Sequence, residues 1–156
     1  MTAPAIRAIS SGFRQAFSTT GRSSRDEFFW FGKLPIPMIF AVMLFAPADT
    51  TPYWVCGVLG VHIVPMWSMG VRRLQDTGGK PLYWNRVIMT IAGGMLSIVI
   101  SYSLPRGYWL ANLAGLAVFP LGFIFFYNLL RIGRFLVAPS QPGPNKYGPN
   151  PNEVPQ

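Results

Sequence analysis

The sequence is poor in charge, in acidic residues and in cysteine. Its 156 residues include 13 Lys and Arg, 5 Asp and Glu and 1 His, so charged residues make up only 12% of the chain. Soluble domains carry about 25%. Because 51% of the residues are hydrophobic, and a chain this short cannot hide so much apolar surface from water, the composition argues against a soluble protein. Cys56 is the single cysteine, which excludes an internal disulfide and a cysteine-based metal site.

The residue patterns that usually carry catalysis are also missing. There is no glycine-rich phosphate loop, no ordered set of Ser, His and Asp, and no carboxylate inside any apolar segment. Asp76 and Glu27 form an acidic pair in principle, but the arginines near them favour ion pairing over acid–base chemistry. The sequence therefore predicts a protein that is not an enzyme and that holds no cofactor and no metal.

What the chain does contain is long apolar segments. They cover residues 28–46, 53–71, 87–104 and 108–130. A helix of about 19 residues is roughly 28 Å long, close to the thickness of the hydrocarbon core. Pro35 and Pro37 interrupt the start of the first segment, and Pro120 predicts a kink in the fourth. The sequence predicts an all-α polytopic membrane protein, with residues 1–137 as one domain of four transmembrane helices.

Both ends of the chain lie outside these segments. Between Ile6 and Phe17, apolar residues recur every three or four positions with basic residues among them. This pattern is typical of an amphipathic helix lying in the membrane interface, so one is expected within residues 1–20; a flexible basic tail is the alternative. Residues 138–156 hold six prolines and no apolar periodicity, which predicts an extended polar tail.

Basic residues predict how the chain is threaded. Four spans place both termini on one side of the membrane. Twelve of the basic residues fall on that side: Arg7, Arg14, Arg22, Arg25, Lys33, Arg72, Arg73, Lys80, Arg86, Arg131, Arg134 and Lys146. Arg106 alone falls on the other side. The positive-inside rule then predicts that both termini are cytoplasmic. The net charge of +8 is therefore expected to attract anionic lipids of the bilayer and not nucleic acid.

Three polar segments fall on the predicted cytoplasmic face, at residues 21–27, 72–78 and 145–151. Residues 72–80, which include the middle segment, are expected to form a loop between two spans. Asp76 and Glu27 are natural partners for nearby arginines, since bidentate pairs suit surroundings of low dielectric constant. We predict one inner-face polar cluster, made of Arg22, Arg25, Glu27, Arg72, Arg73, Asp76, Asn145 and Tyr147. Two roles stay open for it: locking the three segments together, or binding an anionic headgroup or phosphate.

A few polar or small residues lie inside the spans. Gly93, Ser97 and Ser101 are four residues apart and form a face on which another helix can pack closely, although they can also be ordinary small residues. Polar residues in a span are candidates for function; here they are His62, Asn112 and Asn128. Because no span holds a carboxylate, a proton relay lacks an acidic partner. His62 is expected to be neutral and hydrogen-bonded to a neighbouring helix.

Three motifs resemble those of a known family. They are the run from Gly21 to Phe31 (GRSSRDEFFWF), the run from Arg72 to Gly78 (RRLQDTG) and the run from Asn145 to Pro151 (NKYGPNP). In this order they resemble the DUF805 family, small bacterial inner-membrane proteins of unknown function. The resemblance extends from about Phe17 to Pro151. It implies a multi-pass protein of the bacterial inner membrane, and it implies no established activity.

The chain departs from the family pattern at two places. Gln75 stands where the family usually has a histidine, so any chemistry of that histidine would be lost in this member. The family also tends to have Ser-Gly-Trp after the Asp-Thr-Gly run, whereas this chain has Gly79-Lys80-Pro81 and its tryptophan only at Trp84.

Two functions from different classes fit these patterns. The first is an accessory or scaffolding subunit that packs against a larger membrane complex and contacts anionic lipid through its basic face. The second is a small oligomeric transporter or channel, with His62, Asn112 or Asn128 lining its path.

Overall fold

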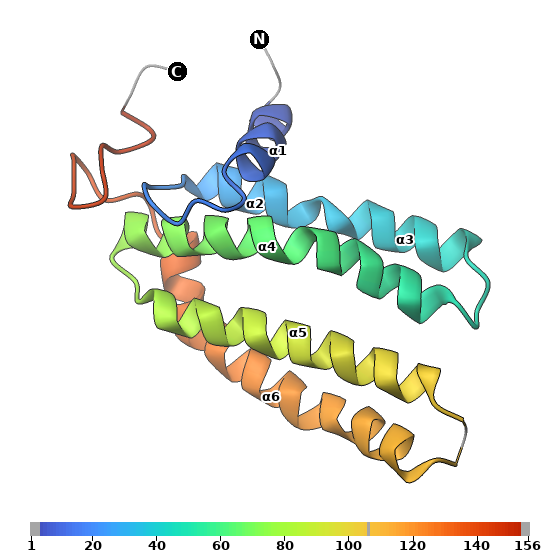
Figure 1. Ribbon diagram of the computed structural model, residues 1–156. Coiled ribbons are helices and arrows are strands. Elements are labelled where there is room, and N and C mark those ends of the chain that lie inside the picture. The colour runs from blue at the N-terminus through green and yellow to red at the C-terminus, as the bar shows by residue number, and fades with distance from the viewer. Residues whose placement is uncertain (1–3, 106, 154–156) are drawn as a thin grey trace.

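The computed structural model describes residues 4–105 and 107–153, leaving aside the side chains of residues 4, 5 and 8. Its regular elements are helices: α1 (Pro4–Arg14), α2 (Arg25–Lys33), α3 (Pro35–Phe45), α4 (Thr51–Thr77), α5 (Pro81–Ser103) and α6 (Trp109–Val137) (Figure 1). Four helical stretches are long and apolar enough to cross a membrane: α2 with α3, α4, α5 and α6. The prediction of an all-α polytopic membrane protein with four spans and a short N-terminal helix is confirmed.

The first span begins with a capping box. Ser24 Oγ accepts a hydrogen bond from the Glu27 amide at 3.2 Å, and the Glu27 carboxylate accepts one from the Ser24 amide at 3.1 Å. This reciprocal pair satisfies amides that the first turn leaves without partners. The span then passes from α2 to α3 at Leu34, where Pro35 starts the second helix. Proline is tolerated there because the first residues of a helix need no amide partner.

The expectation of a loop at residues 72–80 is wrong for residues 72–77, because α4 runs on through them to Thr77, and residues 78–80 form the turn between α4 and α5. Gly78 ends the helix in the left-handed region, with φ of 76°. The Gly79 amide then donates to the Leu74 carbonyl at 2.8 Å, as in a Schellman motif. The charged residues stay helical because segments distant in sequence satisfy their side chains. α6 likewise continues beyond the predicted end at residue 130 to Val137.

Packing is tightest at the end of the bundle that carries the termini. In Figure 1 the α3–α4 hairpin and the α5–α6 hairpin converge toward that end and separate toward the opposite turns. The buried apolar cluster lies at the converging end: Phe28, Phe31, Met69, Val71, Leu74, Trp84, Val87, Ile132 and Leu136. Trp84 is the largest of these and lies against Gly70 of α4, where the missing side chain makes room for its indole ring. The Trp84 Nε1–H donates to the Trp67 carbonyl at 3.0 Å.

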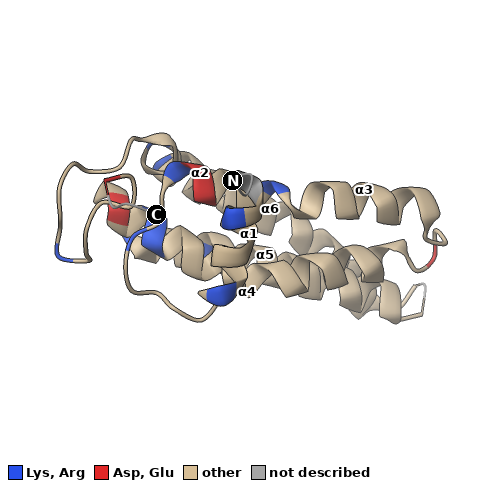
Figure 2. Cartoon of the chain, turned by 90° about the horizontal axis from the view of Figure 1, so that it is seen from above, with Lys and Arg blue, Asp and Glu red and all other residues tan. Residues whose placement is uncertain are grey.

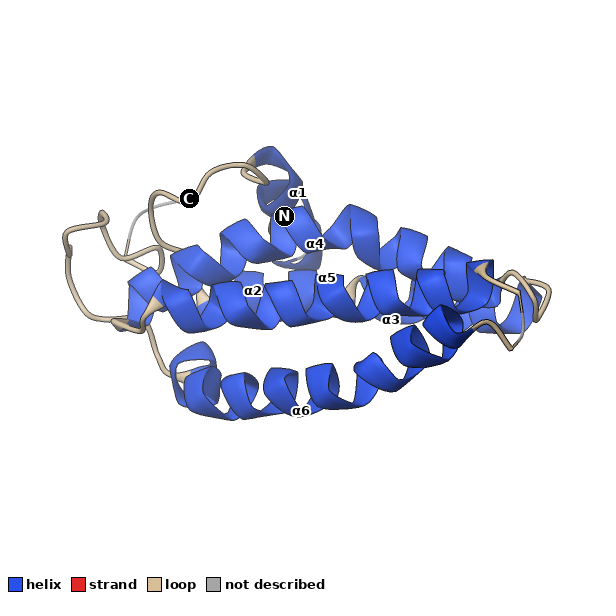
Figure 3. Cartoon of the chain, turned by 60° about the horizontal axis from the view of Figure 1, so that its bottom comes forward, coloured by secondary structure: helices blue, strands red, loops and turns tan. Residues whose placement is uncertain are grey.

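The two polar ends of the chain fold back onto this region. α1 packs beside α2, and Gly12 lies against the ring of Phe31. Residues 1–3 of the predicted N-terminal helix lie outside the described residues. The expected extended tail is wrong for the described part, since residues 139–153 form successive turns against the end of α4 (Figure 3). The Gln141 amide donates to the Asp76 carbonyl at 3.2 Å.

Candidate functional site

Charged residues gather at one end of the molecule. Figure 2 shows Lys, Arg, Asp and Glu mainly in the half that carries both termini, while the apolar lengths of the helices extend away from it. Among the described residues, Asp49 is the charged residue at the opposite end, in the turn between α3 and α4. Arg106, the single basic residue expected on that far side, lies outside the described residues. The polar end is therefore the place to look for a site.

Asp76, near the end of α4, lies between two buried arginines. Its Oδ1 accepts a hydrogen bond from Arg22 Nε at 2.8 Å, and its Oδ2 accepts one from Arg73 Nη1. The side chains of Arg73 and Asp76 are 0% exposed and that of Arg22 is 1% exposed. Arg73 and Asp76 share one face of α4 because they are three residues apart. We name these three residues the Arg–Asp–Arg triad.

Main-chain carbonyl oxygens accept the remaining hydrogen bonds of the triad arginines. Arg22 Nη1 donates to Gly143 at 2.7 Å, and Arg73 Nε donates to Leu136 at 3.2 Å. The carbonyl acceptors include those of Ser23, Leu136, Ala138, Gln141, Gly143 and Gly148. An arginine can do this because its planar fork presents five donors. The triad thus joins the segment before α2, the end of α4, the end of α6 and the tail.

Arg72 is buried as well but points away from the triad. Its Nη1 donates to the side-chain oxygen of Gln15, just after α1. Next to it, Ser68 Oγ donates to the Gln15 carbonyl at 3.0 Å, so that two polar residues of α4 hold this segment. Nε and Nη2 of Arg72 have no hydrogen-bond partner among the described residues. Arg72 and Arg73 are adjacent in sequence but contact different ends of the segment between α1 and α2. Arg72 contacts Gln15, and Arg73 contacts the Ser23 carbonyl.

The other residues predicted for the inner-face polar cluster lie around the triad without joining it. Arg25 is exposed and forms a 3.7 Å ion pair with Asp26. Glu27 is engaged in the α2 capping box and also accepts from Ser23 Oγ at 3.2 Å. Asn145 Nδ2 donates to the Gln75 carbonyl at 3.2 Å, which attaches the tail to α4.

Among the described residues, Tyr147 forms a hydrogen bond through its main-chain amide, which donates to Asn145 Oδ1 at 2.9 Å. Its ring lies below the ammonium group of Lys146, at 4.9 Å. Of the eight predicted residues, three meet directly and one attaches the tail next to them. Since Arg22 and Arg73 are buried and fully engaged, the geometry favours the locking role over headgroup binding for this cluster.

The three polar residues of the spans do not converge. His62 Nε2 lies 3.0 Å from the Phe31 carbonyl, and its ring stacks on the Phe31 ring at 4.3 Å. The Phe31 carbonyl lacks the usual donor four positions on, because Pro35 has no amide hydrogen, and besides contacting His62 it accepts a hydrogen bond from the Leu34 amide at 3.1 Å. Asn112 lies exposed in the first turn of α6. Asn128 is buried in α6 and donates back to the Ile124 carbonyl at 2.7 Å. The three residues therefore do not form one shared polar site.

The small residues of α5 lie along its contact with α6. A side-chain carbon added at Gly93 would meet Leu121 of α6 at 3.5 Å, and one added at Gly115 would meet Ser101 at 3.2 Å. Close approach of the two helices therefore uses small residues on both sides. Ser97 lies between Gly93 and Ser101 on α5 and is half-buried.

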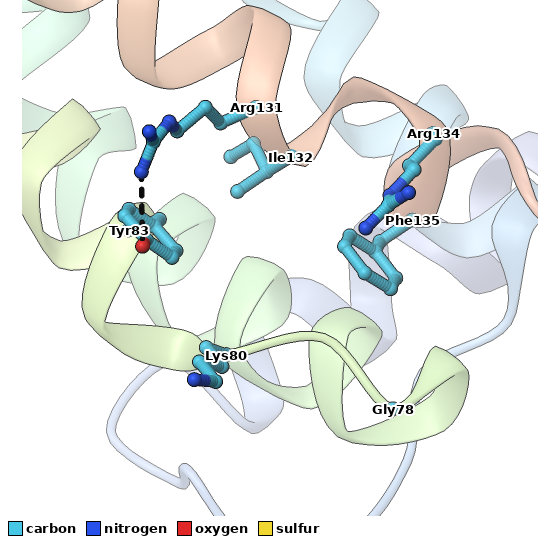
Figure 4. A pocket seen from close by; sticks show the side chains of 7 residues that line it. All are labelled: Gly78, Lys80, Tyr83, Arg131, Ile132, Arg134 and Phe135. Carbon is cyan, nitrogen blue, oxygen red and sulfur yellow. Dashed lines mark hydrogen bonds between the residues drawn. The ribbon is translucent and has the colours of Figure 1, made fainter.

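One polar site was missed by the sequence analysis. A cavity of about 350 Å³ lies where the α4–α5 turn faces the end of α6, and its lining includes Lys80, Tyr83, Arg131 and Arg134 (Figure 4). The sequence analysis used these basic residues only to predict orientation. Lys80 and Arg131 are about fifty positions apart, so only the packing of α5 on α6 brings them together. A second signal was available, since Arg131 and Arg134 are one helical turn apart on α6.

The chemistry that these sites allow is electrostatic. Both carboxylate oxygens of Asp76 accept hydrogen bonds from arginine, so this group is not free to take a proton from a substrate. Within residues 4–105 and 107–153, no group of three His, Cys, Asp or Glu residues is placed to hold a metal ion. The described groups can hold segments together or attract anions.

Comparison with known proteins identifies the family. The family model described as protein of unknown function (DUF805) matches residues 16–149. No curated protein and no solved structure matches the chain. The matched range includes the triad, all four spans and the part of the tail that contacts α4. The chain is therefore a member of the DUF805 family, as the three sequence motifs suggested, and an integral membrane protein.

Proposed function

We propose that this protein is a non-enzymatic accessory or scaffolding subunit of the bacterial inner membrane. In this proposal both termini are cytoplasmic, the basic cytoplasmic face contacts anionic lipid, and the spans pack against a larger membrane complex. The observation that carries the proposal is a groove between α4 and α5 that the chain itself leaves unfilled.

The groove lies where the two hairpins begin to separate. It has a volume of about 390 Å³ and is lined by apolar side chains together with Trp67 and Asn85. Trp67 Nε1 donates to Asn85 Oδ1 at 2.8 Å, so the indole N–H and the amide oxygen of the groove are paired with each other. Met89 at its edge is 73% exposed. A largely apolar groove suits a helix of a partner, because helices in lipid associate mainly through close packing.

The distribution of burial supports the same role. In α5 and in α6, only 6% of an apolar stretch of 18 residues is buried inside the protein, against 39% of the corresponding stretch of α4. These two helices therefore offer most of their surface to lipid or to a partner. The triad, in contrast, uses its charges to fix the polar end. The chain thus combines a locked end with a largely uncovered hairpin, as expected of a packing subunit.

The proposed orientation rests on the positive-inside rule. Most of the basic residues assigned to the cytoplasmic side lie before α2, in the last turns of α4 and α6, at the start of α5 or in the tail, all near the end that carries the termini. A cytoplasmic location for this end also places exposed cations next to anionic headgroups of the inner leaflet.

The oligomeric transporter or channel has less support from the geometry. His62 lines a cavity of about 110 Å³ whose other lining residues are apolar or glycine. Asn112 and Asn128 are not part of that lining. A path for an ion needs polar groups that follow one another, and His62, Asn112 and Asn128 have separate partners or settings.

Site-specific cross-linking in cells tests the proposed role. With a benzoylphenylalanine in place of Met89, illumination is expected to give a discrete adduct with one larger membrane protein, because this position lies at the groove. The adduct is purified in mild detergent and its partner identified by mass spectrometry.

Phe40 of α3 provides the matched control, since it is 62% exposed and is not part of the groove lining. The same photo-reactive residue at this position is expected to give no discrete adduct. Adducts of equal pattern from both positions would contradict the proposal. An adduct of twice the 17.3 kDa chain mass from Met89 would favour the oligomeric alternative instead.

A further inference from the structure

We infer that the cavity between the α4–α5 turn and the end of α6 binds the phosphate of an anionic phospholipid. The inference rests on the proposed contact between the basic face and anionic lipid, and it names the site of that contact. This site is separate from the inner-face polar cluster, for which headgroup binding was one of the two roles that the sequence left open. We name it the basic cavity, with Lys80, Tyr83, Arg131 and Arg134 as its polar lining.

Among the described residues, no carboxylate neutralises the charge of the basic cavity. Its lining contains three cations and no carboxylate. The described ion pairs join Arg22 or Arg73 to Asp76, and Arg25 to Asp26, so none of them includes Lys80, Arg131 or Arg134. Asp76, two residues before Gly78 of the lining, is the acidic residue nearest to it in sequence, and both of its oxygens are already engaged in the triad. In the described part of the chain, three cations around one cavity therefore lack an anion.

The arginines of the basic cavity are held in place by aromatic rings. Arg131 Nη1 donates to the Tyr83 hydroxyl at 3.1 Å (Figure 4), and its guanidinium lies over the rings of Tyr83 and Tyr127 at 5.5 and 4.9 Å. The guanidinium of Arg134 lies 4.7 Å from the centre of the Phe135 ring. Such stacking orients the planar fork and leaves other N–H groups for a ligand. The Tyr83 hydroxyl accepts from Arg131, so its own hydrogen is available to an anion.

The beginning of α5 adds to the positive potential. α5 starts at Pro81, and its N-cap residue Lys80 makes no side-chain capping hydrogen bond. The first amides of a helix without a side-chain cap favour an anion nearby. Since Lys80 and Tyr83 both line the basic cavity, this helix terminus adjoins it. The helix end is an additional contribution and the three unneutralised cations are the principal one.

The surroundings favour a lipid phosphate over a free phosphate ion. The lining of the cavity also includes Ile132 and Phe135, which provide an apolar surface beside the cations. Immediately before Arg131 on α6, the side chains of Phe126 and Leu130 are exposed by 58% and 65%. They belong to the predicted span of residues 108–130, so Arg131 and Arg134 lie within the first turn or so beyond it, at the headgroup level. Acyl chains could then lie along α6 while the phosphate occupies the basic cavity.

Native mass spectrometry with phosphatidylglycerol and phosphatidylcholine tests the inference. The wild-type protein is expected to retain phosphatidylglycerol in preference to phosphatidylcholine. The double variant Arg131→Gln and Arg134→Gln is expected to bind phosphatidylglycerol about tenfold or more weakly, because two charge-assisted contacts are lost. Neither side chain is fully buried, so the variant should keep its melting temperature. Tyr83→Phe, which removes only a hydroxyl, provides a milder variant with an expected loss of about threefold.

Controls separate this site from general attraction and from a free-anion site. The variant Arg14→Gln and Arg25→Gln removes the same charge from exposed positions outside the basic cavity and is expected to keep the preference. An equal loss in this control would overturn the site and leave only diffuse contact with anionic lipid. No preference in the wild-type protein would overturn both the site and the proposed lipid contact. Inorganic phosphate bound as tightly as phosphatidylglycerol would overturn the assignment to lipid.

Discussion

Replacing Asp76 by alanine should lower the free energy of unfolding by about 3–5 kcal/mol, the range for breaking a buried ion pair on one side. The change leaves Arg22 and Arg73 buried, with side chains 1% and 0% exposed, and without the single carboxylate between them. The loss is measured as a fall in melting temperature in detergent. The tail should also become more accessible to protease at Lys146, because Arg22 holds the carbonyls of Gln141 and Gly143 only while Asp76 orients it.

Asp49→Ala is the matched control for this prediction. Asp49 is exposed and takes part in none of the described ion pairs, so its removal should change stability by less than about 0.5 kcal/mol. Similar small effects at both positions would contradict the structural role of the triad. The double variant Asp76→Ala and Arg22→Met should be more stable than Asp76→Ala alone, since one uncompensated buried charge is then replaced by an apolar side chain.

Gly70→Ala should destabilise the protein by about 1–3 kcal/mol through overpacking. A side-chain carbon at this position would overlap the indole ring of Trp84, which is 3% exposed and central to the buried apolar cluster. Moving the ring would also break its hydrogen bond to the Trp67 carbonyl, so the upper part of this range is expected. The measurement is again the melting temperature in detergent, accompanied by the fluorescence of the displaced tryptophan.

Gly57 offers a control on the same helix. An added carbon at Gly57 meets no described atom within 4 Å, so Gly57→Ala should leave stability unchanged or raise it by up to about 1 kcal/mol through helix propensity. If both alanine variants behaved alike, the close approach of α4 and α5 at Gly70 would be wrong.

The sequence predicted the features that depend on local patterns. Hydropathy indicates spans because lipid offers no hydrogen-bond partners to the backbone, so that a crossing segment must be both apolar and helical. The capping role of Ser24 with Glu27 could likewise be predicted, because both partners lie within one turn. The interruption at Pro35 follows from the missing amide of proline.

The predicted ends of α4 and α6, at residues 71 and 130, are too early, because charged residues are not by themselves a sign of a loop. The run from Arg72 to Thr77 stays helical since its charged groups find partners between α1 and α2, in α6 and at the start of the tail, all distant in sequence. The better local signal was Gly78, which can adopt the left-handed conformation that ends a helix.

To predict which residues pair within the polar end, the helix period is needed as well as the rule that opposite charges attract. Arg73 and Asp76 share a face of α4, whereas Arg72 is turned about 100° from Arg73 and so reaches Gln15 instead. The period of α4 is enough to separate these two arginines from sequence alone. The basic cavity is a different case, because the packing of α5 against α6 brings Tyr83 to Arg131 and no local pattern indicates that pairing.

The central claim is that the chain crosses the membrane four times with the triad on the cytoplasmic side, and reporter fusions test it most directly. Alkaline phosphatase inserted after Asp49, in the turn between α3 and α4, should be active, because this turn is expected outside the cytoplasm. The same reporter after Gln156 should be inactive, and a fluorescent protein there should be bright. An active phosphatase at the C-terminus, or the same result at both positions, would contradict the account.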